Sequence, residues 1–291
     1  SFTNPYWTVD GVSIGWDVYQ RNVDPTSLSV ATYKSSSIGA GVRFGYPIAE
    51  DDRINFGLAI DQTKISVYDT SPAPYISFVN SFGDTARSLV ATAGWARDRR
   101  DSFLYPTSGV YQRASLEVAT PVLDLRYARA SYQHQHWFPF GGGHALMLNG
   151  DVGYAHGYDG KELPFYKNFY AGGIGSVRGY QQSTLGPRYL DANNYSRALG
   201  GNRRAVANAE YYFPMPGQGK EKSMRLSVFA DAGYVWGPDD KVQASDLRYS
   251  AGLAFSWSSP VGPLKFSLGQ ALKKKDGDKT QKFQFQLGTV F

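Results

Sequence analysis

The sequence LRYSAGLAFSWS, residues 247–258, carries the clearest structural signal in the chain. Apolar residues alternate one by one with small or polar residues, and alternate side chains point to opposite faces of a strand. This period of two predicts a β-strand with one apolar face, and the stretch is long enough to cross a bilayer as a tilted strand, which takes about 9–11 residues. The face expected to meet lipid comprises Leu247, Tyr249, Leu253, Phe255 and Trp257.

The same alternation recurs along the rest of the chain. Each segment that shows it is bounded by Gly, Pro or Asp-Gly, which are typical of turns. About twelve strands are predicted in this way. They cover residues 12–18, 38–45, 54–67, 88–98, 110–118, 127–137, 145–155, 204–213, 224–236, 247–258, 264–272 and 279–291.

The connections between these strands alternate in length. Short turns are expected at residues 10–11, 47–52, 105–109, 138–144, 214–223 and 259–263, and longer loops at 20–33, 69–85, 237–246 and above all 157–203. Short turns on one side and long loops on the other are typical of an outer-membrane barrel. The prediction is an all-β chain in which residues 1–291 form a single domain, a transmembrane antiparallel up-and-down β-barrel. A soluble β-sandwich is the alternative, and the length of the strands disfavours it.

Composition excludes several other classes of protein. The 291 residues include 32 Gly, 21 Tyr, 17 Phe and 6 Trp, and only 19% are charged, which argues against a disordered chain. Apolar runs are too short for membrane-spanning helices. The absence of cysteine excludes disulfides and thiol sites. A net charge of +5, spread along the chain, is too dilute for a nucleic-acid partner.

No arrangement of residues points to catalysis, a cofactor or a metal. His134 and His136 share a strand face, but no acidic cluster accompanies them, and girdle or turn histidines are the simpler interpretation. The Gly173–Ser176 segment lacks the nucleophile elbow of a serine hydrolase. We therefore expect a protein that is not an enzyme and that needs no cofactor.

The long loop at 157–203 is unusual in composition. Residues 165–180, FYKNFYAGGIGSVRGY, are too aromatic and too rich in glycine for a solvated tip, so the loop is expected to fold inward and plug the lumen. A guanidinium in the lumen, such as that of Arg178, would be costly without a partner. The strand parity supplies two inward carboxylates, Glu210 and Asp231, on adjacent strands.

At this point the residues resemble a known family. Val177, Arg178, Gly179 and Tyr180 resemble the VRGF/VRGY loop signature of the outer-membrane assembly superfamily. The segments FYAGG at 169–173, TLGP at 184–187, FADAGYVW at 229–236, SSPVGP at 258–263 and FTNPYWTVDGVS at 2–13 resemble its barrel assembly factors as well. In that family the loop arginine pairs with lumen acids of the next two strands, which here are Glu210 and Asp231.

The resemblance implies a place for this chain within a longer protein. Family members carry periplasmic POTRA domains and a sixteen-stranded barrel, and this chain corresponds to the C-terminal part that follows the fourth strand. The last strand would then lie at the barrel seam, with Phe283, Phe285, Leu287 and Phe291 on its outward face and the C-terminus on the periplasmic side. In this chain we expect the remaining strands to close on themselves as a smaller barrel.

The function implied is the folding and insertion of other β-barrel proteins into the outer membrane of Gram-negative bacteria. The partners implied are unfolded outer-membrane proteins, accessory lipoproteins of the assembly complex, and outer-membrane lipid and lipopolysaccharide. The alternatives are a passive porin, which should conduct ions steadily, and a two-partner secretion or TamA-type transporter, which shares the loop signature. An outer-membrane phospholipase or protease is a further alternative, for which the sequence offers no recognisable site.

Overall fold

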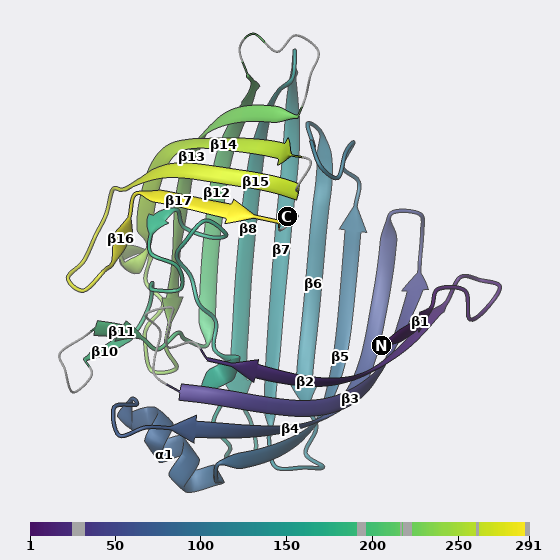
Figure 1. The fold of residues 1–291 in the computed structure, drawn as a ribbon, viewed down its shortest axis with the longest axis vertical. Helices are drawn as coiled ribbons and strands as arrows, with labels where there is room; N and C mark the ends of the chain where they lie inside the picture. The colour runs from purple at the N-terminus through teal and green to yellow at the C-terminus, as the bar shows by residue number, and fades with distance from the viewer. Residues whose placement is uncertain (25–32, 191–195, 216, 218–222, 260–261, 289–291) are drawn as a thin grey trace.

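One antiparallel sheet forms the body of the protein (Figure 1). The computed structural model describes residues 1–24, 33–190, 196–215, 217, 223–259 and 262–288. The sheet has 13 strands, and each pairs with its neighbours in chain order. The strands are β1 (Phe2–Asn4), β2 (Ser13–Val23), β3 (Tyr33–Pro47), β4 (Asp52–Val67), β5 (Thr85–Asp98), β6 (Gly109–Ala119), β7 (Tyr127–Gly141), β8 (His144–Gly157), β12 (Arg203–Pro214), β13 (Met224–Trp236), β14 (Arg248–Ser259), β15 (Gly262–Ala271) and β17 (Phe283–Leu287).

Twelve of these strands coincide with the predicted ones, and β1 is the addition. It is three residues long and covers one end of β2. The last predicted strand, 279–291, is divided: β16 (Thr280–Gln281) pairs away from the main sheet, β17 follows, and residues 289–291 lie outside the described part.

The two faces of the sheet follow the predicted alternation. On β14, Leu253 is 57% exposed while its neighbour Ala254 is 3% exposed. Ser250, which lies four residues before Ala254 and therefore on the same face, is also buried. The outward apolar face and the inward small or polar face are therefore confirmed on this strand. We call the inward, concave face of the sheet the lumen face.

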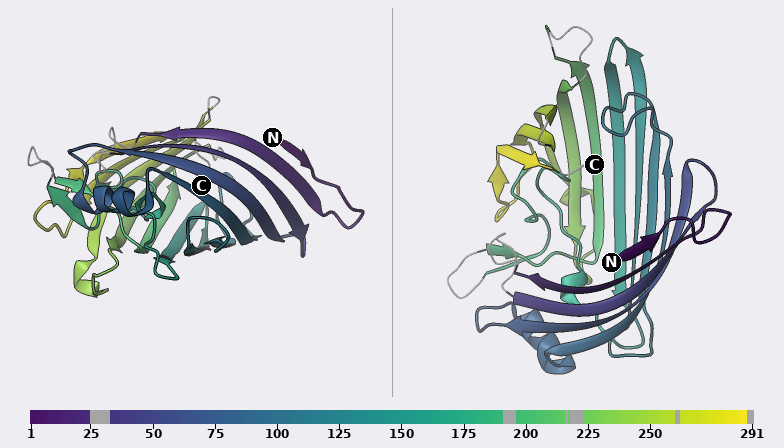
Figure 2. Two further views of the ribbon diagram at one scale, coloured as in Figure 1. Left: turned by 90° about the horizontal axis from the view of Figure 1, so that it is seen from below. Right: turned by 45° about the vertical axis from the view of Figure 1, so that its right-hand side comes forward.

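The sheet is strongly curved but has two edges (Figure 2). They are β1 and β17, and in the described residues β17 pairs only with β15 while β2 pairs with β1 and β3. The expectation that the first and last strands close on each other is therefore wrong for this part of the chain. The residues available to β17 make only five register pairs with β15, so the edge is short.

Residues 69–85 were expected to form a loop, but they contain a helix, α1 (Ala73–Phe82). Proline lies at its first turn, and Gly83 ends it with a φ of 85°, a conformation that glycine adopts without strain. Tyr75 and Phe78, three residues apart, are buried against Phe165, whose ring lies 3.8 Å from that of Tyr75. The helix exists because this aromatic face is covered by the long loop.

The long connection between β8 and β12 lies on the lumen face (Figures 1 and 2). It contains four short elements: η2 (Phe165–Lys167), β9 (Gly179–Tyr180), β10 (Arg188–Leu190) and β11 (Ser196–Ala198). A last short element, η3 (Ala244–Asp246), precedes β14. Among the described residues, no helix has the length and apolar character needed to span a membrane.

Candidate functional site at the tip of the long loop

The Arg178 side chain is clamped between two carboxylates. Its Nε and Nη2 atoms donate hydrogen bonds of 2.7 and 2.8 Å to the two oxygens of Asp231, and its Nη1 atom donates one of 2.7 Å to Glu210. The backbone N–H of Arg178 also donates to Asp231, at 3.0 Å. All three residues are at most 2% exposed. The sequence-based pairing of the loop arginine with both acids is therefore present in the structure.

The surroundings of Arg178 favour its charged form. Burial disfavours the charge, but the hydrogen bond to Asp231 and the charges of Glu210 and Asp231 outweigh it and raise the pKa of Arg178 above its usual range. The guanidinium also lies over the ring of Phe229, with 3.5 Å between its carbon and the ring centroid. Its planar fork thus has one flat side against an aromatic ring and its edge against carboxylates.

Three lumen residues that sequence reasoning did not single out complete this network. Lys265 Nζ lies 3.5 Å from Glu210, and Ser227 Oγ donates to Glu210 at 2.6 Å. Asn208 donates both to Asp231 and to the carbonyl of Ser176 in the loop. Parity alone places these side chains on the lumen face. Which groups these side chains bind depends on the register and curvature of the sheet, which the sequence does not reveal.

The loop backbone touches the sheet closely at Gly179. This residue has a φ of 84°, and a Cβ atom there would lie 3.1 Å from the backbone of Gly269 on β15. A Cβ on Gly269 would in turn lie 2.7 Å from the Gly179 nitrogen. Glycine on both sides of the contact is what permits the approach.

The tip of the loop is also tied to the last strands. β9 pairs with β16, and Gln284 on β17 donates to the Tyr180 carbonyl at 2.7 Å and accepts from the Gly179 N–H at 3.4 Å. The Tyr180 hydroxyl donates to the carbonyls of Tyr249 and Lys273. The VRGY segment therefore contacts five strands of the sheet, β12, β13, β14, β15 and β17. Sequence reasoning anticipated only the first two of these.

The two apolar residues of the motif fill a core beneath the tip. Val177 and Tyr180 are fully buried. They belong to a cluster between loop and sheet that comprises Ala171, Val177, Tyr180, Leu185, Val206, Val235 and Ala271. All four residues of the motif thus hold the loop against the lumen face: Arg178 by ion pairs, Gly179 by backbone packing, and Val177 and Tyr180 through this apolar cluster.

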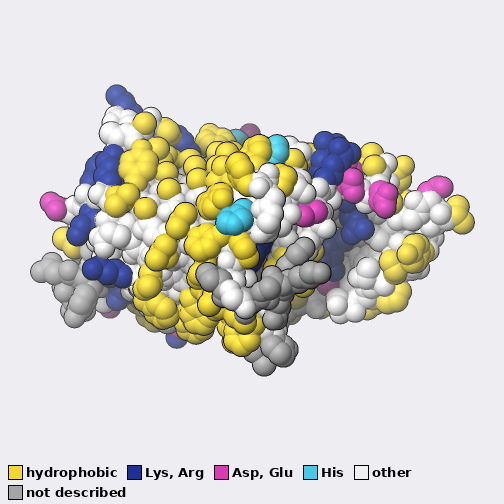
Figure 3. All heavy atoms as spheres, turned by 90° about the horizontal axis from the view of Figure 1, so that it is seen from above, with side chains coloured by type: hydrophobic (Ala, Val, Ile, Leu, Met, Phe, Trp, Pro, Cys, Tyr) yellow, Lys and Arg dark blue, Asp and Glu magenta, His cyan; other side chains and the backbone are white. Residues whose placement is uncertain are grey.

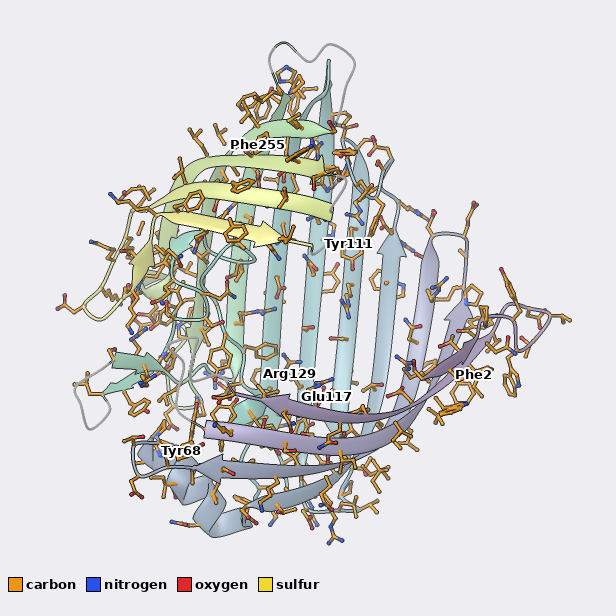
Figure 4. The ribbon with its side chains drawn as sticks, in the orientation of Figure 1. Phe2, Tyr68, Tyr111, Glu117, Arg129 and Phe255 are labelled. Carbon is orange, nitrogen blue, oxygen red and sulfur yellow. The ribbon has the colours of Figure 1, made fainter. Side chains whose placement is uncertain are left out.

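The first part of the long loop is held to the sheet by a second set of contacts. These lie nearer the end of the sheet where the long loops are. Phe169 lies between two guanidinium groups, 4.2 Å from that of Arg129 and 5.2 Å from that of Arg204. Lys167 donates to Glu117 at 2.6 Å. Figure 4 shows Glu117 and Arg129 close together on β6 and β7. The loop is therefore fixed to the sheet at two separate places.

The predicted seam residues and the two histidines, His134 and His136, are not part of the network around Arg178. Phe283, Phe285 and Leu287 on β17 are all more than half exposed, on the outward face of the edge strand, and Phe291 lies outside the described residues. The rings of His134 and His136 are 6.1 Å apart. Within the described residues, no group of three or more His, Cys, Asp or Glu side chains is arranged to hold a metal ion.

Comparison with known proteins places this architecture in a family. A family model described as the Omp85 superfamily domain matches residues 1–291. The chain belongs to the Omp85 superfamily. The Omp85 chain is 43% identical to the outer membrane protein assembly factor BamA of Neisseria meningitidis serogroup B, over 100% of its own length and 41% of that protein. It spans less than half the length of the curated BamA relatives that it matches.

Solved structures agree with the Omp85 assignment. A crystal structure of BamA from Haemophilus ducreyi lacking POTRA domains 1–3 superimposes with a TM-score of 0.89 and 27% identity, over 97% of this chain and 60% of that one. CdiB from Acinetobacter baumannii shares the fold with a TM-score of 0.58 and 14% identity, over 94% of this chain and 46% of that one. The predicted outer-membrane barrel fold is confirmed, and the likeness to BamA is greater than the likeness to CdiB.

Proposed function

We propose that this Omp85 chain is the barrel part of a factor that folds other β-barrel proteins and inserts them into the outer membrane. The observation that carries the proposal is the joining of the VRGY loop to the last strands of the sheet. Arg178 is bound to β12 and β13, and the adjoining Gly179 and Tyr180 are bound by Gln284 of β17. A loop held in this way organises the lumen beside an edge strand that can pair with another strand.

The proposed partners follow from this chemistry and from the relatives. An unfolded outer-membrane strand would add to the sheet edge by main-chain hydrogen bonds, with no covalent step, so we propose no enzymatic activity. Accessory lipoproteins, outer-membrane lipid and lipopolysaccharide are proposed as further partners. The short turns and the C-terminus would face the periplasm, as in barrels whose long loops are extracellular.

Reconstitution tests the proposal. The chain, in liposomes, should accelerate the folding of an added unfolded outer-membrane barrel protein, measured by the heat-sensitive shift of the folded form on a gel. Arg178→Ala should slow this reaction, because the loop would no longer be tied to β12 and β13. Liposomes without the chain provide the baseline. An unchanged folding rate with the wild-type chain would refute the proposed function.

Conductance distinguishes the proposal from a passive porin. The long loop fills part of the lumen through its two anchors, at Arg178 and at Phe169, so the wild-type chain in a planar bilayer should not conduct steadily. Arg178→Ala should raise the conductance. A steady, open-channel current from the wild-type chain would favour the porin instead.

A further inference from the structure

The connection between β5 and β6, residues 99–108, is braced by hydrogen bonds of its own. The Asp101 carboxylate accepts from the N–H of Thr107 at 2.8 Å and from its hydroxyl at 2.6 Å. The Arg100 guanidinium donates to both oxygens of Asp98, at 2.8 and 2.6 Å. These bonds lie within the connection or join it to the strand end beside it. The connection would therefore move as one body.

Gly109 sets the angle at which this connection leaves the sheet. It has a φ of 105°, which glycine adopts without strain, and a Cβ atom there would overlap the backbone of Arg99 and Arg100. The two ends of the connection therefore pass each other closely at a position that only glycine suits. A change of backbone angle at this position would swing the whole connection.

The far end of the connection is bonded to the other side of the lumen face. Arg225 Nη1, on β13, donates to the Pro106 carbonyl at 2.8 Å, and the Tyr105 hydroxyl donates to the Ser223 carbonyl at 3.3 Å. In the sheet, β7, β8 and β12 lie between β6 and β13. Neighbouring strands are about 4.8 Å apart, so the connection crosses about 19 Å of the wall. It lies over the short-turn mouth of the lumen.

A cavity of about 380 Å³ lies between this connection and the tip of the long loop. Residues 103–106 form one wall and residues 174–176 another, and Arg178 and Glu210 also line the cavity. Figure 3 looks onto this end of the molecule, where apolar side chains cover much of the surface. The connection therefore separates the ion pairs of the long loop from the short-turn side.

The bonds that hold the far end are of a weak kind. Each runs from one side chain to one backbone carbonyl, whereas Arg178 holds the long loop through ion pairs with two carboxylates. The apex of the connection is also loosely packed, since Phe103 and Leu104 are 59% and 50% exposed. The connection is thus rigid inside and lightly fastened at its far end.

We propose that the 99–108 connection is a lid on the short-turn mouth of the lumen, latched by Arg225 and Tyr105 and hinged at Gly109. Opening this lid would join the cavity to the surrounding water. Ion pairs are weaker in water than in a protein interior, so an open lid would also loosen the hold of Glu210 on Arg178. The proposal concerns access to the lumen, and it does not rest on the proposed function.

The distance between two spin labels measures the position of the lid. The chain has no cysteine, so Leu104→Cys at the apex of the lid and Val228→Cys on the outward face of β13 can be labelled without interference. Double electron–electron resonance in lipid nanodiscs should show a main, shorter distance and a minor, longer one. Adding Arg225→Gln should raise the fraction of the longer distance about two- to tenfold, as expected for the loss of one hydrogen bond.

Two pairs of variants locate the latch. Tyr105→Phe keeps the ring and removes only the hydroxyl, so it should raise the open fraction less than Arg225→Gln does. Its matched control is Tyr158→Phe, which removes a hydroxyl that donates to the Ala119 carbonyl at 2.5 Å, far from the lid. The control for Arg225→Gln is Arg203→Gln, because that guanidinium also donates to backbone carbonyls. Neither control should change the distance.

Cysteine labelling measures access to the cavity separately. Ile174→Cys places a thiol at the tip of the long loop, in the wall of the cavity. Its reaction with a water-soluble maleimide should become faster in Arg225→Gln by the same factor as the open fraction. Leu190→Cys, at a position that is 65% exposed, should react at the same rate with either residue at position 225.

Two outcomes would overturn the proposal. One is a distance distribution that neither Arg225→Gln nor Tyr105→Phe changes, and the other is an equal change in the matched controls. Tyr105→Phe removes a single oxygen atom, so it decides the question if Arg225→Gln does not fold. A chain whose lid opens but which does not accelerate barrel folding would refute the proposed function and leave the lid standing. Accelerated folding with an immobile lid would do the reverse.

Discussion

Arg178 and Arg225 are both buried on the lumen face, yet their surroundings are opposite. Arg178 is held by two carboxylates, one of them Asp231 on β13, the strand that carries Arg225. Arg225 is held by aromatic rings and one backbone carbonyl. The Arg178 guanidinium joins the long loop to β12 and β13 through ion pairs. The Arg225 guanidinium joins β13 to the turn at Pro106 through one hydrogen bond and packs among rings.

The largest loss of stability is expected from removing the Arg178 guanidinium, which is held by two carboxylates. Arg178→Ala strands two buried carboxylates and should lower the free energy of unfolding by about 3–5 kcal/mol. Chemical denaturation of the chain in detergent measures this loss. Arg178→Lys, which keeps the charge but not the fork, should fall between wild type and Ala. Adding Asp231→Asn to Arg178→Ala should recover part of the loss, and a fully additive double variant would contradict the assigned pairing.

A guanidinium introduced on the outward face of the sheet should lower the stability nearly as much as Arg178→Ala does. Leu253 faces outward, so Leu253→Arg would place the charge toward lipid at a cost of about 2–4 kcal/mol. Gln133→Arg is the control, because that side chain faces the lumen opposite Asp151. Folding yields in lipid bilayers should differ sharply between the two variants. Equal yields would show that the assignment of the two faces is wrong.

Replacing Gly179, the glycine next to Arg178, should lower the free energy of unfolding by less. Gly179→Ala forces an alanine to a φ of 84° and brings its Cβ to 3.1 Å from Gly269. We expect a loss of about 1–3 kcal/mol, together with faster proteolysis of the long loop. Gly160→Ala tests strain without contact, because a Cβ there meets no atom within 4 Å although φ is 72°. If both variants lose the same stability, the close approach to β15 contributes nothing.

The smallest loss of stability is expected from replacing Arg225, which forms no salt bridge among the described residues. Arg225→Gln strands no carboxylate and loses the hydrogen bond to Pro106, so it should cost only about 0.5–1.5 kcal/mol. The same denaturation series provides the measurement. A loss as large as that of Arg178→Ala would mean that Arg225 is a structural lock as well, and the contrast between the two arginines would disappear.

Much of the fold was readable from local pattern. Alternation with period two places Leu253 outward and Ala254 inward, and it needs no knowledge of neighbouring strands. The same parity places Glu210 and Asp231 in the lumen before any partner is known. The loop was expected to fold inward because it is too apolar to be solvated, and its VRGY residues were recognisable by their resemblance to the loop signature of the family. Helix α1 was missed, since its aromatic face at Tyr75 and Phe78 is stabilised by a residue of the distant loop.

The sequence by itself therefore determined the strands, their two faces and the candidate motif, because each depends on residues close together in the chain. Only the tertiary structure decided which inward side chains meet. Register and curvature bring Lys265 to Glu210 and Gln284 to Tyr180, and they leave Arg225 among rings. They also leave β17 at an edge of the sheet. These outcomes depend on contacts between segments far apart in sequence, and a one-residue shift in register would exchange the two faces of a strand.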